Sequence, residues 1–354
     1  MKVKPVGPIP PGYDAIGGEL AIDGHRVSDL VEAAGRTPLF VYSRALLGAR
    51  VSKLRSALPS RIGLNYAVKA NPHPTVVGHM ATLVDGFDIA SSGELGITIA
   101  AGIDSSRVSF AGPGKRDDEV EAAIGAGVTL NCESGGEAER SLAIGQRIGK
   151  APKIAIRVNP SFELKGSGMK MGGGAKQFGV DADWVPELAR DVIAEGAEWR
   201  GLHIFTGSQA LSAEAIIEAQ GNVLKLASEL SRDIGERLPK LNMGGGFGIP
   251  YFPGDEPLDL DAVGAALGEH VANLREDLAR TELCLELGRY LVGEAGVYLC
   301  RVVDRKESHG TTYLVTDGGL HHQLAASGNF GTVVRRNYPV AIASHFDAEP
   351  AEVV

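Results

Sequence analysis

The sequence predicts an α/β fold, in which a closed (β/α)8 barrel of parallel strands is joined to a second, all-β domain. Short apolar runs rich in branched residues recur eight times over about 225 residues, and helical stretches separate most of them. The runs are mostly apolar and do not alternate, as expected for parallel strands that are buried on both faces. No G-x-G-x-x-G turn follows the first run, which argues against the alternative, an open doubly wound sheet.

The candidate strands follow one another along the central part of the chain. They are Ile62–Val68, Phe87–Ala90, Val108–Ala111, Val128–Cys132, Ile154–Val158, Gly201–Phe205, Lys240–Met243 and Glu282–Leu287. The candidate helices between them are Thr75–Leu83, Gly93–Ala100, Asp117–Ile124, Gly136–Ile148, Val185–Ala194, Ala213–Ile234 and Leu260–Leu278. With a short strand at Leu39–Tyr42 and a helix to about Leu58 in front, we assign the barrel domain to residues 37–287.

The two ends of the chain have a different pattern. Residues 1–36 form an extended arm with a hairpin signal at Asp23-Gly24. Residues 288–354 have no long helix but contain strand-like runs at Leu291–Val292, Val297–Val303, Thr312–Thr316 and Val333–Ile342. We therefore predict that residues 288–354 form an all-β domain, which the arm joins. Since the chain stops in what resembles the start of another strand, we expect this domain to be incomplete at its C-terminus.

The composition argues against several classes of protein. A hydrophobic content of 44% and a charged content of 22% are typical of a soluble globular protein. The net charge of −9, without a basic block, argues against nucleic acid or an anionic membrane as a partner. Neither a signal peptide nor an apolar run of about 18 residues is found. The three widely spaced cysteines argue against a disulfide framework, so we expect a cytoplasmic protein.

Polar residues lie at or near the carboxyl ends of the candidate strands, where barrel enzymes place their chemistry. In chain order they are Lys69, Asp88, Arg157, Asn159, His203, Gly244, Gly245, Gly246, Glu286 and Arg289. Each has an ordinary interpretation. A histidine in an apolar strand is usually a core residue, a glycine triplet is usually a turn, and Glu286 with Arg289 would form a structural ion pair. In a barrel, however, all of them converge on one end.

Their combination suits pyridoxal phosphate. A lysine at the end of a buried strand carries a costly charge, and its neutral amine can form a Schiff base with an aldehyde. Barrels frequently bind phosphate with the loops after strands seven and eight, where Gly244–Gly246 bare the backbone and Arg289 adds donors. His203 would stack on a ring, and Glu286 would meet a pyridine nitrogen. No metal site is predicted.

Five motifs resemble those of the fold-type III pyridoxal-phosphate decarboxylases, among them the diaminopimelate, ornithine and arginine decarboxylases. The motifs are Tyr66–Asn71, Phe87–Ser91, His203–Gln209, Gly244–Tyr251 and Glu286–Arg289. The runs Glu286–Gly296 and Thr316–His322 most resemble the pyridoxal-dependent decarboxylases associated with exosortase systems. The resemblance covers nearly the whole chain. It implies a barrel of the alanine-racemase type and a homodimer in which the partner completes each active site.

The resemblance also implies the roles of three site residues. Lys69 would carry the Schiff base to the cofactor, and His203 would stack on the face of the pyridine ring. Glu286 would keep the pyridine nitrogen protonated, which makes the ring a strong electron sink. Racemases of this fold typically have an arginine there and a weaker sink. We therefore predict a carboxy-lyase that decarboxylates an amino acid or an amino-acid conjugate.

Other residues would act around this centre, again by resemblance. Gly244–Gly246 and Arg289 would hold the phosphate, or Arg289 would also meet a substrate carboxylate. Ser208 would add a hydrogen bond to the phosphate. Asp88 and Arg157 would orient the lysine and the ring.

Two departures from the family pattern bear on turnover and on the substrate. The cysteine and tyrosine that the family contributes across the dimer interface are not found before the chain stops. The arginine-proline and the tyrosine that bind diaminopimelate are replaced by the sequence of residues 321–331. We therefore expect a conjugated or modified amino acid as the substrate, with diaminopimelate as an alternative. A non-catalytic homologue that binds a partner is the alternative of a different class.

A glycine-rich loop, Lys165–Gly174, follows the fifth candidate strand. It either closes over the barrel as a lid or serves only as a flexible connection.

Overall fold

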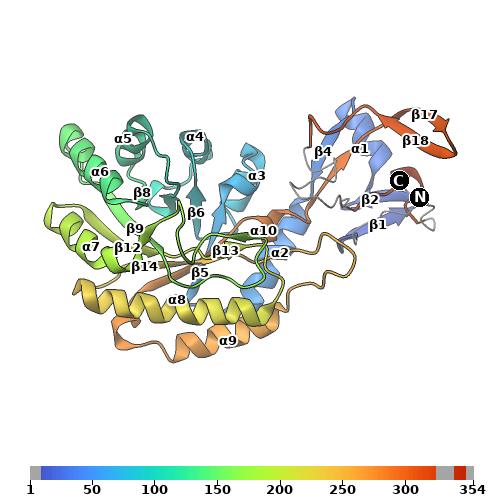
Figure 1. Ribbon diagram of the computed structural model, residues 1–354. Helices are drawn as coiled ribbons and strands as arrows, with labels where there is room; N and C mark the ends of the chain where they lie inside the picture. Colours follow the sequence, from blue (N-terminus) through green and yellow to red (C-terminus); the bar gives the residue numbers. More distant parts are fainter. Residues whose placement is uncertain (1–8, 324–338, 348–354) are drawn as a thin grey trace. The chain divides into compact units, whose positions relative to one another are not determined.

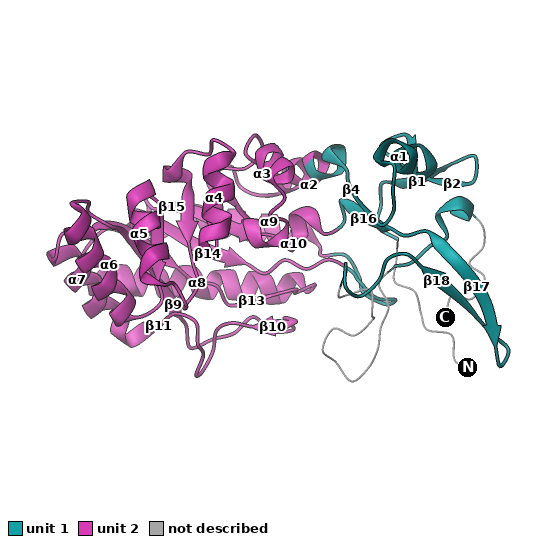
Figure 2. Ribbon diagram, turned by 90° about the horizontal axis from the view of Figure 1, so that it is seen from above, with its two compact units in different colours: residues 1–47, 250–257, 294–354 teal, residues 48–249, 258–293 magenta. Residues whose placement is uncertain are grey.

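The computed structural model describes residues 9–323 and 339–347 (Figure 1). The chain forms two compact units, which Figure 2 colours differently. The barrel unit comprises residues 48–249 and 258–293, and the terminal unit comprises residues 1–47, 250–257 and 294–354. The barrel unit thus starts and ends later in the chain than the barrel domain assigned to residues 37–287, and the segment 250–257 leaves it.

Eight parallel strands close into a ring in the barrel unit, which confirms the predicted barrel. Each strand pairs with its neighbours in chain order, and the last strand pairs with the first. The strands are β5 (Ile62–Ala67), β6 (Gly86–Ile89), β7 (Val108–Phe110), β8 (Thr129–Cys132), β9 (Lys153–Asn159), β12 (Glu198–His203), β14 (Lys240–Gly245) and β15 (Glu282–Leu287). Their residues are nearly all buried, as the uninterrupted apolar runs predict.

Helices lie around the outside of this ring (Figure 1). They are α2 (Arg44–Ala57), α3 (Pro74–Met80), α4 (Ser92–Ala100), α5 (Asp117–Ala126), α6 (Gly135–Ile148), α7 (Val185–Ala194), α8 (Ala213–Ile234) and α9 (Leu260–Ala272). Local sequence sets several of their ends. The side chains of Ser91, Ser134 and Ser212 accept backbone N–H bonds at the N-termini of α4, α6 and α8. Gly149 and Gly235 end α6 and α8 in the left-handed conformation.

Short elements complete the barrel unit. They are the 3-10 turns η1 (Val68–Ala70), η2 (Ser105–Arg107), η3 (Ala182–Trp184) and η4 (Glu276–Leu278), the strands β10 (Met169–Lys170), β11 (Val180–Asp181) and β13 (Gly207–Ser208), and the helix α10 (Arg289–Val292). Two sequence predictions were wrong here. Leu291–Val292 is helical because Tyr290, Leu291 and Val292 all turn into the core. The predicted helix 260–278 stops at Ala272, since Asn273 departs from helical geometry.

The terminal unit is built mainly from small antiparallel sheets. Strands β1 (Tyr13–Ile16), β2 (Glu19–Ile22) and β3 (His25–Arg26) form one sheet, and helix α1 (Val27–Ala34) follows. Strand β4 (Leu39–Tyr42) pairs with β16 (Gly296–Leu299), and β17 (Val302–Ser308) pairs with β18 (Thr311–Thr316). A final 3-10 turn, η6, spans Ala343–His345. Most of the predicted strand Val333–Ile342 lies outside the described residues.

The strand that joins the C-terminal segment is therefore β4, whereas the strands of residues 1–36 pair with one another.

Within the described ranges, no helix is long and apolar enough to cross a membrane. The three cysteines are free thiols, and Cys132 and Cys284 are buried in the core.

Candidate active site

Lys69 lies in the turn η1, directly after the first barrel strand. Its Nζ atom is 3.9 Å from Oε1 of Glu286 on β15, because β15 pairs with β5 where the ring closes. The same Nζ is 5.9 Å from the centre of the Phe205 ring. The sequence argument assumed that the charge of Lys69 is buried, but 57% of the side chain is exposed. The turn after Ala67 lifts the residue out of the strand and makes its amine accessible.

Glu286 is the polar residue around which the site is arranged. Its side chain is 4% exposed, and its Oε2 lies 3.1 Å from Nε2 of His203, which ends β12. The Asn242 amide, on the intervening strand β14, donates to Glu286 Oε2 at 3.4 Å. Burial alone would raise the pKa of Glu286, but the close contact with His203 and the charge of Lys69 outweigh it and lower the pKa to about 2. Glu286 is therefore ionised at neutral pH.

His203 is neutral in the same site. Only 2% of its side chain is exposed, and burial lowers the pKa of the imidazole although Glu286 favours its charged form. Among the described residues, neither Nδ1 nor Nε2 makes a hydrogen bond, although Nε2 lies 3.1 Å from Glu286 Oε2. A neutral ring whose nitrogens are not hydrogen-bonded is suited to bind a polar group or to lie against a planar ring.

Asp88, on β6, is a second buried carboxyl group close to Glu286. Ser109 and Asn242 both donate to its Oδ1, whereas Oδ2 has no partner among the described residues. Burial, together with the negative charge of Glu286, raises the pKa of Asp88 to about 7. Below neutral pH, this pair of carboxyl groups therefore holds mainly one negative charge, and Glu286 carries it.

The glycine loop Gly244–Gly246 ends β14 and approaches its neighbours too closely for a side chain. Gly244 and Gly246 have positive φ angles of 67° and 81°. A Cβ atom on Gly245 would meet the carbonyl oxygen of Glu286 at 2.2 Å, and one on Gly246 would meet that of Gly207 at 2.5 Å. The N–H of Gly244 is not bare, because it donates to Asn242 Oδ1 at 2.9 Å. The loop thus presents backbone alone at this end of the barrel.

Ser208 and Arg289 lie in the two loops next to the glycine loop. Ser208 is half-buried in β13, which pairs with β10 of the glycine-rich segment 165–174. Arg289 opens α10, is exposed, and donates from Nη1 to Oε1 of Gln209 at 3.4 Å. The segment 165–174 is therefore attached to the barrel through β10.

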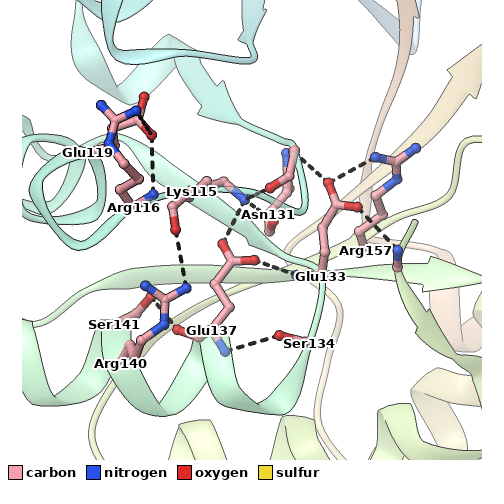
Figure 3. Close-up of polar contacts among 12 residues, drawn as sticks. Lys115, Arg116, Glu119, Asn131, Glu133, Ser134, Glu137, Arg140, Ser141 and Arg157 are labelled. Carbon is pink, nitrogen blue, oxygen red and sulfur yellow. Dashed lines mark hydrogen bonds and ion pairs between the residues drawn. The ribbon is translucent and has the colours of Figure 1, made fainter. Parts of the chain in front are cut away.

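Arg157, on β9, is held in a buried network of charges (Figure 3). Its Nη1 donates to Glu133 at 2.9 Å, and the guanidinium lies 4.8 Å from the centre of the Phe178 ring. The other oxygen of Glu133 accepts the N–H of Gly179 at 3.1 Å, in the loop that follows the glycine-rich segment 165–174. No contact with Lys69 is recorded within the described residues. Arg157 therefore helps to anchor the loop at Phe178 and Gly179, and its charge also helps to lower the pKa of Glu286.

The network continues to a second buried ion pair. Lys115 Nζ lies 2.6 Å from Glu137 Oε1, with 1% and 3% of the two side chains exposed. The same ammonium donates to the carbonyl oxygens of Gly112 and Asn131, so all three of its protons are used. Glu137 in turn accepts the N–H of Glu133 at 3.0 Å. Figure 3 shows these side chains joining the loops that follow β7 and β8.

Sequence reasoning missed Glu133, Asn242 and Gln209. Glu133 directly follows a candidate strand, which is the signal that selected Lys69. Asn242 lies inside a candidate strand among apolar residues, where a buried amide stands out. Gln209 closes a motif that was noted, but nothing in its local sequence indicates the contacts of its side chain.

Comparison with known proteins identifies the family. The family model "Pyridoxal-dependent decarboxylase, pyridoxal binding domain" matches residues 44–293. The chain belongs to the pyridoxal-dependent decarboxylases. Its barrel fold, its pyridoxal phosphate cofactor and its carboxy-lyase activity, all predicted from sequence, are thereby confirmed. The association with exosortase systems stays a prediction.

Several curated relatives match most of this chain. The L-glutamyl-[BtrI acyl-carrier protein] decarboxylase of Niallia circulans is 33% identical over 86% of this chain and 72% of its own length. The diaminopimelate decarboxylase of Archaeoglobus fulgidus is 32% identical over 95% and 78%. Among solved structures, the diaminopimelate decarboxylase of M. jannaschii in complex with L-lysine has a TM-score of 0.81 at 25% identity, covering 93% of this chain and 77% of its own.

The residues at the carboxyl end of the barrel fit this cofactor. Asp88 Oδ2 and His203 Nδ1 are buried polar atoms without partners among the described residues. The glycine loop packs so closely on neighbouring backbone that no side chain fits there, and it therefore offers only backbone groups. An accessible lysine amine, an ionised carboxylate and a side-chain-free loop correspond to an aldehyde, a pyridine nitrogen and a phosphate, respectively.

Proposed function

We propose that Lys69 binds the aldehyde of pyridoxal phosphate and that Glu286 and His203 hold its ring. When bound, the protonated pyridine ring of this cofactor withdraws electrons from the substrate carbon that loses carbon dioxide. The observation that carries the proposal is the buried carboxylate of Glu286, 3.9 Å from Lys69 Nζ, whose pKa is lowered by its neighbours, since an ionised carboxylate keeps a pyridine nitrogen protonated. The neutral imidazole of His203 adds no competing positive charge beside it.

The phosphate group would lie against Gly244–Gly246, with Ser208 and Arg289 as donors. The close backbone packing of the glycine loop and the exposed guanidinium of Arg289 support this assignment. Arg289 would also be able to bind the substrate carboxylate. Asp88 and Arg157 would act through their neighbours. Asp88 and Glu286 both accept a hydrogen bond from the Asn242 amide. Arg157 binds Glu133, which in turn holds the loop at Gly179.

Covalent trapping would test the lysine assignment. Borohydride reduction of the protein with bound cofactor is expected to label the peptide that contains Lys69, and Lys69→Ala should abolish the label. Lys165→Ala is a matched control, because Lys165 is exposed and pairs with Glu218 away from Glu286. A label that survives Lys69→Ala at full yield would refute the assignment.

The substrate that we propose is an amino acid whose distal end is conjugated to a larger group. The similarity to a decarboxylase of a glutamyl acyl-carrier protein supports this choice. The sequence of residues 321–331, which stands where diaminopimelate decarboxylases have an arginine-proline and a tyrosine, also supports it. Diaminopimelate is the second candidate, since several relatives with that activity match the chain at 30–35% identity.

Carbon dioxide release would distinguish the candidates. L-glutamyl acyl-carrier protein, free L-glutamate and diaminopimelate would be compared with pyridoxal phosphate present. Faster release from the conjugate than from either free amino acid is the expected result. Release from diaminopimelate alone would favour the second candidate, and no release from a broad panel with cofactor bound would indicate the non-catalytic homologue.

We further propose a cytoplasmic homodimer. The hairpin β17–β18 is exposed along its length and presents Val303, Tyr313 and Leu314 to solvent at 59%, 46% and 44%, which supports burial against a second copy. The free cysteines support a reducing compartment. Sedimentation would test the homodimer, and a fully active monomer would contradict it. Cell fractionation would test the cytoplasmic location.

A further inference from the structure

Gln209 has a backbone conformation that its residue type disfavours. Its φ angle is 61°, in the left-handed region where glycine is the usual residue. The described residues contain two other non-glycine cases, Asp23 and His309. Both precede a glycine in a hairpin turn, which explains their conformation. Gln209 follows β13 and has no such local explanation.

The side chain of Gln209 spans two loops at the carboxyl end of the barrel. Its Nε2 donates to the carbonyl oxygen of Ile249 at 2.6 Å, and its Oε1 accepts the N–H of Ile249 at 3.2 Å. One amide thus satisfies both backbone groups of a residue just beyond the glycine loop. The same Oε1 accepts from Arg289 Nη1 at 3.4 Å, which brings in the loop after β15.

The backbone beside Gln209 strengthens this connection. The N–H of Ala210 donates to the carbonyl of Gly246 at 2.9 Å, and the N–H of Gly248 donates to the carbonyl of Ala210 at 2.8 Å. The loops after β12 and β14 are therefore joined from Gly246 to Ile249. The Gln209 side chain connects these hydrogen-bonded loops to Arg289.

We propose that Gln209 is a positioning residue that preforms the phosphate-binding surface. Its left-handed backbone directs the amide toward Ile249, where it fixes the end of the glycine loop and holds Arg289 beside it. Without the amide, phosphate would have to order these groups as it binds, and affinity would fall. This inference rests on the proposed phosphate site of Gly244–Gly246, Ser208 and Arg289.

Two ligands that differ only in the phosphate test this role. Apoprotein would be titrated with pyridoxal phosphate and with pyridoxal, and binding followed by protein fluorescence. For Gln209→Gly, which relaxes the backbone but removes the amide, we expect about tenfold weaker binding of pyridoxal phosphate, the effect of losing roughly one to two net hydrogen bonds. Binding of pyridoxal should change less than about twofold, since it does not use the phosphate surface.

Gln209→Glu is the second variant and keeps the size of the side chain. Its carboxylate can still accept from Ile249 and Arg289, but it cannot donate to the Ile249 carbonyl and it repels a phosphate. We expect it to lose affinity for pyridoxal phosphate at least as strongly as Gln209→Gly. His309→Gly is the control for backbone relief alone, and both affinities should match the wild type.

Equal losses for the two ligands, or no loss for either, would overturn the role of Gln209. If Gln209→Gly does not fold, the Glu variant alone decides between these outcomes. A wild-type protein that binds pyridoxal as tightly as pyridoxal phosphate would refute the phosphate site itself. Because the titration uses no substrate, it is independent of the proposed conjugate specificity.

Discussion

Replacing Asp88 by asparagine should stabilise the apoprotein at pH 8 and much less at pH 5. Asp88 is buried, and its pKa is raised from 3.8 to about 7 by burial and by the charge of Glu286. An acid with a raised folded-state pKa contributes stability that is present below its unfolded pKa and is lost as pH rises through the folded pKa. Asparagine does not titrate, so the free energy of unfolding of the variant should not fall in this way as pH rises.

The expected size follows from the pKa difference. Between pH 5 and pH 7 the side chain is ionised in the unfolded chain but mainly protonated in the folded one. Each pH unit therefore lowers the free energy of unfolding of the wild type by about 1.4 kcal/mol. The free energy of unfolding of Asp88→Asn, relative to the wild type, should therefore increase by about 3 kcal/mol from pH 5 to pH 8. The substitution is sterically mild, since Oδ1 keeps its bonds from Ser109 and Asn242 and the new NH₂ group replaces the unpartnered Oδ2.

Urea denaturation of both apoproteins at pH 5, 6, 7 and 8 would measure this difference. Groups that titrate in both proteins cancel in the comparison. Asp183→Asn, at an exposed aspartate in η3, is the matched control and should show a difference that does not vary with pH. A pH-independent difference for Asp88→Asn as well would show that Asp88 is already ionised in the fold at pH 5, and the reasoning would be refuted.

Three further changes test the packing and charge of the site. Lys115→Met leaves the carboxylate of Glu137 buried and unpaired, so we expect a loss of about 3–5 kcal/mol in urea denaturation, largely restored by Glu137→Leu in the same chain. Gly245→Ala places a methyl group 2.2 Å from the carbonyl oxygen of Glu286 and should cost about 1–3 kcal/mol. Glu286→Gln should remove the stability that the wild type loses as pH falls from about 4.5 to about 2, because the pKa of Glu286 is lowered in the fold.

Each of these changes has an outcome that would contradict it. If Glu137→Leu did not restore the stability lost in Lys115→Met, then Lys115 and Glu137 would act through other contacts. For Gly245, the control is Gly268→Ala in α9, whose nearest neighbour would be 4.0 Å away and which should not destabilise. Similar losses for the two glycines would disprove the steric argument. Parallel acid unfolding curves for Glu286→Gln and the wild type would mean that Glu286 is not held ionised.

The amino-acid sequence alone was sufficient to predict the barrel and to propose most of its candidate site. Eight apolar runs with helices between them leave few arrangements other than parallel strands buried on both faces. Because such a barrel brings the carboxyl ends of all strands together, Lys69, His203 and Glu286 could be placed at one end without any distance being known. Their residue types then suggested the cofactor, and the resemblance supplied their roles.

Which of these groups lie close to one another depends on the tertiary structure. Glu286 lies near Lys69 because the ring closes between β15 and β5, a pairing of segments about 220 residues apart that no local pattern records. The exposure of Lys69, the partnership of Arg157 with Glu133 and the bridge formed by Gln209 depend on strand register and loop contacts. Local sequence reports burial and periodicity, whereas charge states and bridging contacts arise from neighbours that are distant in the chain.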